Sequence, residues 1–293
     1  MGKVNDSFCV EMKDFSKTKS SFLVAIAAVS LGSAQASDMI ISTTQGAGAY
    51  NTTLGSASGS IAPSIYNFDN LPTGANNNVS WSGVGSIDHV GVLDADVYGG
   101  APSKIRPDGT SYAVQSTTLG GGVATTTLSL NTASSYFGFY WSAGDGANDL
   151  KFYRANTLTA EFKSSDLFAR LDSSYNGNPL AAHSGDSNEK FAFVNFIGDA
   201  TTAWDKVIFS NNSNSGFESD NWTSRVQAWT PGTDGPAVPG DPKLRIKDGV
   251  VTSISSLPSD FSAPGAPAPP MTACLAFAGV LLLQAFRRNK SVA

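Results

Sequence analysis

Cysteine, histidine and charged residues are all scarce in this chain of 293 residues. Two cysteines, Cys9 and Cys274, and two histidines exclude a zinc ribbon, an iron–sulfur site and a disulfide framework. Charged residues make up 15% of the sequence, below the usual level of about 25%. Because the formal net charge is −5, the basic surface that binds phosphates in nucleic-acid-binding proteins is missing. Nucleic acid is therefore excluded as a main partner.

Long apolar runs are also few, and the first follows a basic segment near the N-terminus. Three lysines between positions 13 and 19 precede the apolar run 22–31, and small residues follow at Ala34 and Ala36. This order is typical of a secretory signal peptide, whereas a membrane-spanning helix needs about 20 apolar residues. We therefore expect residues 1–36 to be a signal peptide that is cut after Ala36.

The second apolar run lies near the C-terminus. A proline-rich stretch, 264–270, precedes the apolar run 271–286, and Arg287 and Arg288 follow it. As a helix this run would span about 24 Å, which is short for a hydrocarbon core of about 30 Å. The basic residues at the end favour a cytoplasmic C-terminus, with residues 37–270 outside. The pattern predicts a membrane anchor that is only just long enough.

An exported body, a proline-rich spacer, a short apolar helix and a terminal basic cluster thus follow one another. This layout resembles the PEP-CTERM class of bacterial exosortase substrates. The sorting motif would comprise Pro267, Pro269 and Pro270, in Pro-Ala-Pro-Pro where the family usually shows Pro-Glu-Pro, together with Arg287 and Arg288. The resemblance implies a sorting protease or transpeptidase of the inner membrane as partner, transient membrane insertion, and a final place at the cell surface or outside the cell. A plain single-pass anchor is the alternative.

Blocks within the body also look like blocks that recur in such surface proteins. They are Phe68–Pro72, Tyr98–Ala101, Tyr136–Asp145, Ala203–Lys206 and Gly216–Asn221. The resemblance implies a surface β-sandwich of Gram-negative bacteria that make exopolysaccharide, and it supplies no catalytic residues.

Strand signals recur through the body, residues 37–230. Polar and apolar residues alternate in Thr157–Lys163, as in a half-buried strand, while Tyr136–Trp141 is apolar on both faces and indicates a central strand. We expect residues 136–163 to form a three-strand meander with a two-residue turn at Ala155-Asn156. Roughly eight to eleven short strands and almost no helix predict an all-β fold, an antiparallel jelly-roll-like β-sandwich.

The composition changes after Thr230 to a stretch rich in proline and glycine. We place a domain boundary there and expect residues 231–270 to be a linker that includes one or two short strands within 244–257. The sorting segment, an apolar helix plus the basic cluster, would then occupy residues 271–293.

Acidic residues suggest one cofactor, calcium. Glu218 and Asp220 are two positions apart, so they share one face of a strand, and Asp69 and Asn70 lie in an early block that could come close to them. Ca²⁺ prefers six to eight oxygen ligands, so backbone carbonyls or water would have to complete the site. The structural alternative is a turn at Asp69-Asn70 and a solvated strand edge at Glu218 and Asp220.

Aromatic residues near polar turns suggest a glycan platform. Tyr98, Tyr140, Trp141 and Trp222 have Asn, Asp and Gly as close neighbours in the sequence, and a sugar face can stack on an aromatic ring. The structural alternative is that these rings fill the core of the sandwich.

Catalysis finds little support in the sequence. With two histidines and no Gly-x-Ser-x-Gly motif, a nucleophilic triad would rest on residue types alone. We therefore expect a non-enzymatic exported surface or matrix protein, processed by a sorting enzyme and associated with exopolysaccharide. A carbohydrate- or calcium-binding lectin-like module is the alternative.

Overall fold

The computed structural model describes residues 37–44, 46–54, 62–184, 188–199, 201–225 and 240–261. The expected signal peptide with its cleavage residues Ala34 and Ala36, and the expected sorting segment, lie outside these ranges. Within them, no helix has both the length and the apolar character needed to cross a bilayer. The single α-helix of the described part, α1 (Ser164–Phe168), has five residues.

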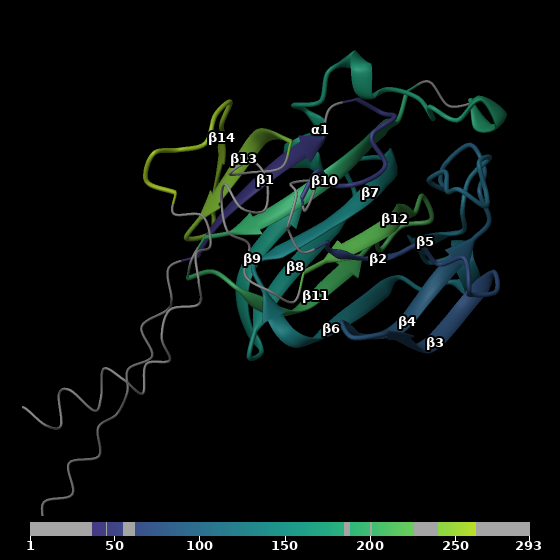
Figure 1. Cartoon of the computed structure of the whole chain (residues 1–293), viewed down its shortest axis with the longest axis horizontal. Coiled ribbons are helices and arrows are strands. Elements are labelled where there is room, and N and C mark those ends of the chain that lie inside the picture. Colours follow the sequence, from purple (N-terminus) through teal and green to yellow (C-terminus); the bar gives the residue numbers. More distant parts are fainter. Residues whose placement is uncertain are drawn as a thin grey trace, which may run out of the picture. The chain divides into compact units, whose positions relative to one another are not determined.

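The described residues form fourteen strands in one antiparallel sheet (Figure 1). The strands are β1 (Asp38–Thr44), β2 (Ser64–Tyr66), β3 (Gly74–Trp81), β4 (Gly85–Leu93), β5 (Tyr112–Gln115), β6 (Thr125–Ser134), β7 (Tyr136–Gly144), β8 (Asp149–Arg154), β9 (Thr157–Lys163), β10 (Lys190–Gly198), β11 (Trp204–Ser210), β12 (Phe217–Ser224), β13 (Asp241–Lys247) and β14 (Val250–Ser253). The expectation of an antiparallel all-β body is therefore confirmed.

The sheet is curled into two halves that β4 connects. The strand order is β14-β13-β1-β10-β7-β12-β5-β4-β6-β11-β8-β9, with β2 added to β12 and β3 added to β4. β3 pairs along almost all of β4. On its other side, β4 pairs through Gly91–Leu93 with β5 and through Gly85–Ile87 with β6. One long strand thus belongs to both halves of the sheet.

Aromatic side chains fill the space between the two halves. Phe209 on β11 stacks on Trp222 of β12, with ring centroids 4.2 Å apart and planes 4° from parallel. Phe152 on β8 contacts Phe196 on β10, at 5.1 Å between centroids. Burying each such ring stabilises the fold by about 1.5–3 kcal/mol, and these contacts bring β8 and β11 over β10 and β12.

The half of the sheet that contains β10, β7 and β12 is buried on both faces at its centre. Every residue of β7, β10 and β12 is buried, and a second apolar cluster on the face away from the aromatic core contains Ala47, Ala101, Tyr140 and Phe193. β7 lies between β10 and β12, as its sequence, apolar on both faces, predicted.

The expected meander over residues 136–163 is wrong in one respect. β8 and β9 form the predicted hairpin, because Arg154 pairs with Thr157 across Ala155 and Asn156. β7, however, does not pair with β8. Both edges of β7 are already occupied by β10 and β12, so β8 pairs with β11 instead.

The sheet continues beyond the boundary expected after residue 230. β13 pairs with β1, and β14 pairs with β13. The short strands expected within 244–257 therefore belong to the same sheet as the body, and they do not form a separate linker. Residues 226–239, between β12 and this pair, lie outside the described ranges.

An ion-pair cluster fixes β13 to β1. The Arg245 Nε donates to Asp38 Oδ1 at 2.7 Å, and the guanidinium also contacts the second oxygen of this buried carboxylate. Its other nitrogens reach the two carboxylate oxygens of Asp260 at 2.8 and 2.9 Å. Lys247 adds a contact to Asp260 at 3.0 Å. Arg245 thus joins the first strand of the sheet to the last described residues.

We expect Arg245→Ala to lower the free energy of unfolding by about 3 kcal/mol, because it leaves the Asp38 carboxylate buried and without its guanidinium partner. Lys247→Ala is the matched control, since Lys247 is largely exposed and such a surface pair contributes about 0–1 kcal/mol. Denaturant unfolding of both variants measures the difference. Equal effects of the two substitutions would show that the cluster contributes little to stability.

Candidate functional site

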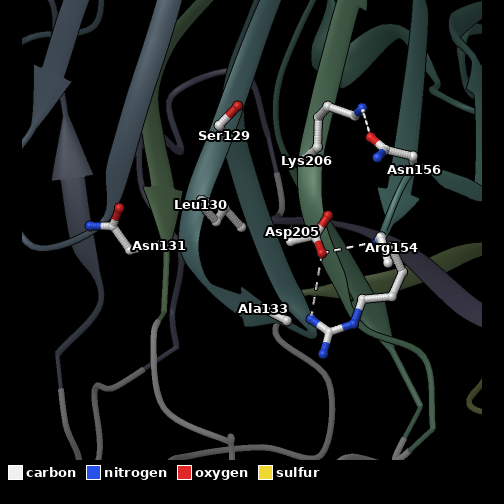
Figure 2. A pocket seen from close by; sticks show the side chains of 9 residues that line it. Ser129, Leu130, Asn131, Ala133, Arg154, Asn156, Asp205 and Lys206 are labelled. Atoms are coloured by element: carbon white, nitrogen blue, oxygen red, sulfur yellow. Dashed lines mark hydrogen bonds and ion pairs between the residues drawn. The ribbon is translucent and has the colours of Figure 1, made fainter.

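A hollow of the described surface lies where β6, β11 and the β8–β9 turn meet (Figure 2). Its volume is about 630 Å³, which falls in the range of roughly 300–1,000 Å³ found for ligand pockets. Figure 2 shows residues of β6 along one side and Arg154, Asn156, Asp205 and Lys206 along the other.

The hollow arises from a mismatch in strand register. Lys206 lies opposite Ser129, and Trp204 lies opposite Ser134. Asp205 alone on β11 therefore faces the whole segment 130–133 of β6. A strand with surplus residues must bend away from its partner, and this bend opens the hollow.

The surplus segment of β6 is held by β4. Leu130 pairs with Gly85, and the Asn131 N–H donates to the Val84 carbonyl at 2.8 Å. β6 therefore pairs with β11 through Thr125–Ser129 along one edge and with β4 through Leu128–Leu130 along the other. The hollow opens where only the pairing with β4 continues.

The β8–β9 turn forms the other wall. Ala155 and Asn156 both have positive φ, 45° and 66°, which matches the two-residue turn predicted from the sequence and is the geometry of a type I′ hairpin. The Ala155 N–H donates to Asp205 Oδ2 at 3.0 Å. The turn is thereby attached to β11.

Two cations lie on this wall. Lys206 Nζ donates to Asn156 Oδ1 at 2.9 Å and lies 4.9 Å from the centroid of the Tyr153 ring. The Arg154 guanidinium is 3.9 Å from Asp205 Oδ2, and its side chain is 52% exposed. Because that distance is at the limit of an ion pair, the Arg154 charge is only weakly neutralised.

A second polar cluster lies beneath the loop between β4 and β5. Asp220 Oδ2 accepts hydrogen bonds from the Ala101 N–H at 2.8 Å and from Thr110 Oγ1 at 2.5 Å. Complete burial raises the pKa of Asp220 to about 7, although its hydrogen bonds act in the opposite direction. Burial likewise raises the pKa of Glu218, which lies two residues away on β12, well above its usual value, and nearby carboxylates add to the shift.

The expected calcium ligand set is not assembled. Asp69 accepts from Arg106 Nη1 at 3.0 Å and from the Ser111 N–H at 3.1 Å, and Asp220 is occupied by the donors named above. The carboxylates of Asp69 and Asp220 do come near each other. Thr110 donates to Asp220, and the next residue, Ser111, donates to Asp69. Asn70, however, is exposed, and the described residues contain no group of three or more His, Cys, Asp or Glu side chains that could hold a metal ion.

The expected glycan platform is wrong for three of its four residues. Tyr140, Trp141 and Trp222 are at most 1% exposed. The Tyr140 hydroxyl donates to the Ala47 carbonyl, and Trp222 stacks in the aromatic core. Tyr98 alone is accessible, at 48%. The structural alternative, that these rings fill the interior, is the correct one for the buried three.

The residues around the hollow were missed from the sequence. The strand at Trp204–Ser210 and the turn at Ala155-Asn156 were both visible as local patterns. Nothing local indicates that Arg154 meets Asp205 or that Asn156 meets Lys206, because each pair is separated by about fifty positions. Comparisons with protein-family models, curated proteins and solved structures find no match to the chain.

The raised pKa values predict a pH dependence of stability. A buried acid that keeps its proton to about pH 7 stabilises the folded state below its unfolded pKa, near 4, and this contribution is lost as the pH rises through about 7. We expect Asp220→Asn to reduce the change in unfolding free energy between pH 5 and pH 8 by about 2–3 kcal/mol, and Glu218→Gln to act in the same direction.

Denaturant unfolding at the two pH values tests this expectation. Asp108→Asn is the control, because Asp108 is exposed and its removal should leave the pH dependence of the parent protein. A pH dependence that stays the same in Asp220→Asn would mean that this carboxyl is ionised in the folded protein at pH 5.

Proposed function

We propose that the protein is a non-enzymatic surface or matrix protein, exported by a signal peptide and sorted through its C-terminal segment in the manner of PEP-CTERM proteins. Its body, a curled antiparallel sheet that we interpret as a jelly-roll-like sandwich, associates with exopolysaccharide through the hollow in Figure 2. The sorting enzyme of the inner membrane is the partner that this proposal requires.

The observation that carries the proposal is the chemistry of the hollow. It offers hydroxyl, amide, guanidinium and ammonium groups from Ser129, Asn131, Arg154, Asn156 and Lys206, which suit the many hydroxyls of a sugar chain. Asp205 is the one carboxylate among the lining residues, and glycoside hydrolysis generally uses two. The hollow therefore favours holding a glycan over cutting it.

The distribution of cysteine fits export. Cys9 and Cys274 both fall in segments that the proposal assigns to the signal peptide and the sorting helix. The exported body then has no thiol that an oxidising compartment could oxidise. Its stability comes from the aromatic core described above.

The export step is tested by intact mass. Protein recovered from the membrane fraction should begin at Ser37, and protein from the medium should in addition lack part of the segment 271–293. A chain that keeps residues 1–36 and remains in the cytosol would refute export.

The glycan step is tested by retention on a gel that carries the exopolysaccharide of the producing organism. We expect the double variant Asn131→Ala/Asn156→Gly to lose retention by about thirtyfold, because it removes two side-chain amides from the hollow and each lost hydrogen bond is worth about 1 kcal/mol. Glycine retains the positive φ of position 156. Asn77→Ala, at an exposed position on β3, is the control. Retention of the double variant equal to that of the parent would refute the site.

A further inference from the structure

We infer that the hollow binds an acidic polysaccharide and that Arg154 and Lys206 contact carboxylates of its uronic acid units. This inference rests on the proposed association with exopolysaccharide. It adds the charge of the ligand and the residues that recognise it.

The Arg154 guanidinium is the first reason. Its contact with Asp205 is 3.9 Å long, and Asp205 Oδ2 already accepts a hydrogen bond from the Ala155 N–H. The half-exposed guanidinium lines the hollow and keeps donors for a ligand, and its planar fork is the geometry that fits a carboxylate.

Lys206 is the second reason. Its Nζ is positioned by Asn156 and by the face of Tyr153, and neither neighbour carries a negative charge. An ammonium has three donors, so donors remain for a ligand. A carboxylate would supply the negative charge that this cation lacks.

The opposite wall suits the rest of a sugar. Ser129 and Asn131 are exposed on β6, and their hydroxyl and amide groups can both donate to and accept from ring hydroxyls. One wall thus provides positive charge and the other provides neutral polar groups. This arrangement matches a chain of sugar units that carry carboxylates and hydroxyls.

The position of Asp205 decides against a cationic ligand. Its Oδ2 is engaged by the backbone of the turn and faces Arg154, so its charge is directed to the protein. Because the whole chain is acidic, with a net charge of −5, a polyanion is repelled by most of the molecule. Attraction is expected only where cations keep donors for a ligand, as Arg154 and Lys206 do in the hollow.

Titration of the purified full-length protein with a galacturonic acid trimer, and with the methyl ester of the same trimer, tests the inference. The ester keeps the ring and its hydroxyls and removes the charge. We expect the acid to bind about tenfold more tightly than the ester, and added salt to weaken the binding of the acid alone.

Variants assign the contact. Arg154→Gln and Lys206→Gln should each weaken binding of the acid about tenfold and leave binding of the ester nearly unchanged. Lys151→Gln is the matched control: it removes the same charge from the strand that carries Arg154, but Lys151 pairs with Glu161 at 3.5 Å and does not line the hollow. Thermal melts confirm that each variant is folded.

Three results would overturn the inference. Equal binding of acid and ester, or an equal loss in Lys151→Gln, would show that no carboxylate is recognised at this site. Absence of trimer binding together with normal retention on the exopolysaccharide gel would remove the acidic class but leave the proposed function. Loss of gel retention in the Asn131→Ala/Asn156→Gly variant, without an effect of Arg154→Gln or Lys206→Gln on binding of the acid, would keep the hollow as a glycan site and remove the two cations from it.

Discussion

The stacking of aromatic rings between the two halves of the sheet is the contact on which the rest of this structure depends. Trp222 and Phe209 lie face to face at 4.2 Å, and Phe139 of β7 packs edge-on against Phe209 of β11 at 5.6 Å. Aromatic pairs contribute about 0.5–1.5 kcal/mol beyond the area they bury. No cysteine lies in the described body, so this layer stabilises the fold without any disulfide.

The face of β7, β10 and β12 that points away from the aromatic layer creates a different problem. Loops cover it, so polar groups of β12 are buried along with apolar ones. Asp220 accepts hydrogen bonds from Ala101 and Thr110, and its complete burial raises its pKa to about 7. A buried ionised carboxylate without a cation would cost several kcal/mol. The loop between β4 and β5 thus supplies the donors that the Asp220 carboxyl needs. The acidic pair of β12, Glu218 and Asp220, is therefore covered and is not open to a cation.

Local sequence patterns predicted the elements of the fold better than their partners. Alternation identified β9, an apolar run identified β7 as central, and Ala155-Asn156 was recognised as a turn. All three depend on neighbours within about ten residues. The pairing of β8 with β11, and of β13 with β1, joins residues separated by about fifty and about two hundred positions, and no local pattern encodes such choices.

Trp222 shows why site prediction failed at the aromatics. It stands between Asn221 and Thr223 in a polar stretch, which favours an exposed ring. In the structure Asn221 has a φ of 47°, and the register of β12 against β7 shifts between Asp220 and Thr223. The bulge turns the indole into the core, so a backbone irregularity that the sequence does not announce reversed the expected exposure.

The candidate binding site has the same kind of origin. The hollow exists because segment 130–133 of β6 faces the single residue Asp205, and β4 holds that surplus segment by the backbone. The shape is therefore set by strand pairing, whereas Ser129, Asn131, Arg154 and Lys206 contribute side chains that the core does not need. Substitution at these positions should change the ligand that the hollow binds and leave the hollow itself in place. The shape of the hollow and its choice of ligand therefore depend on different parts of the chain. For this reason, changing one side chain at a time can identify the ligand.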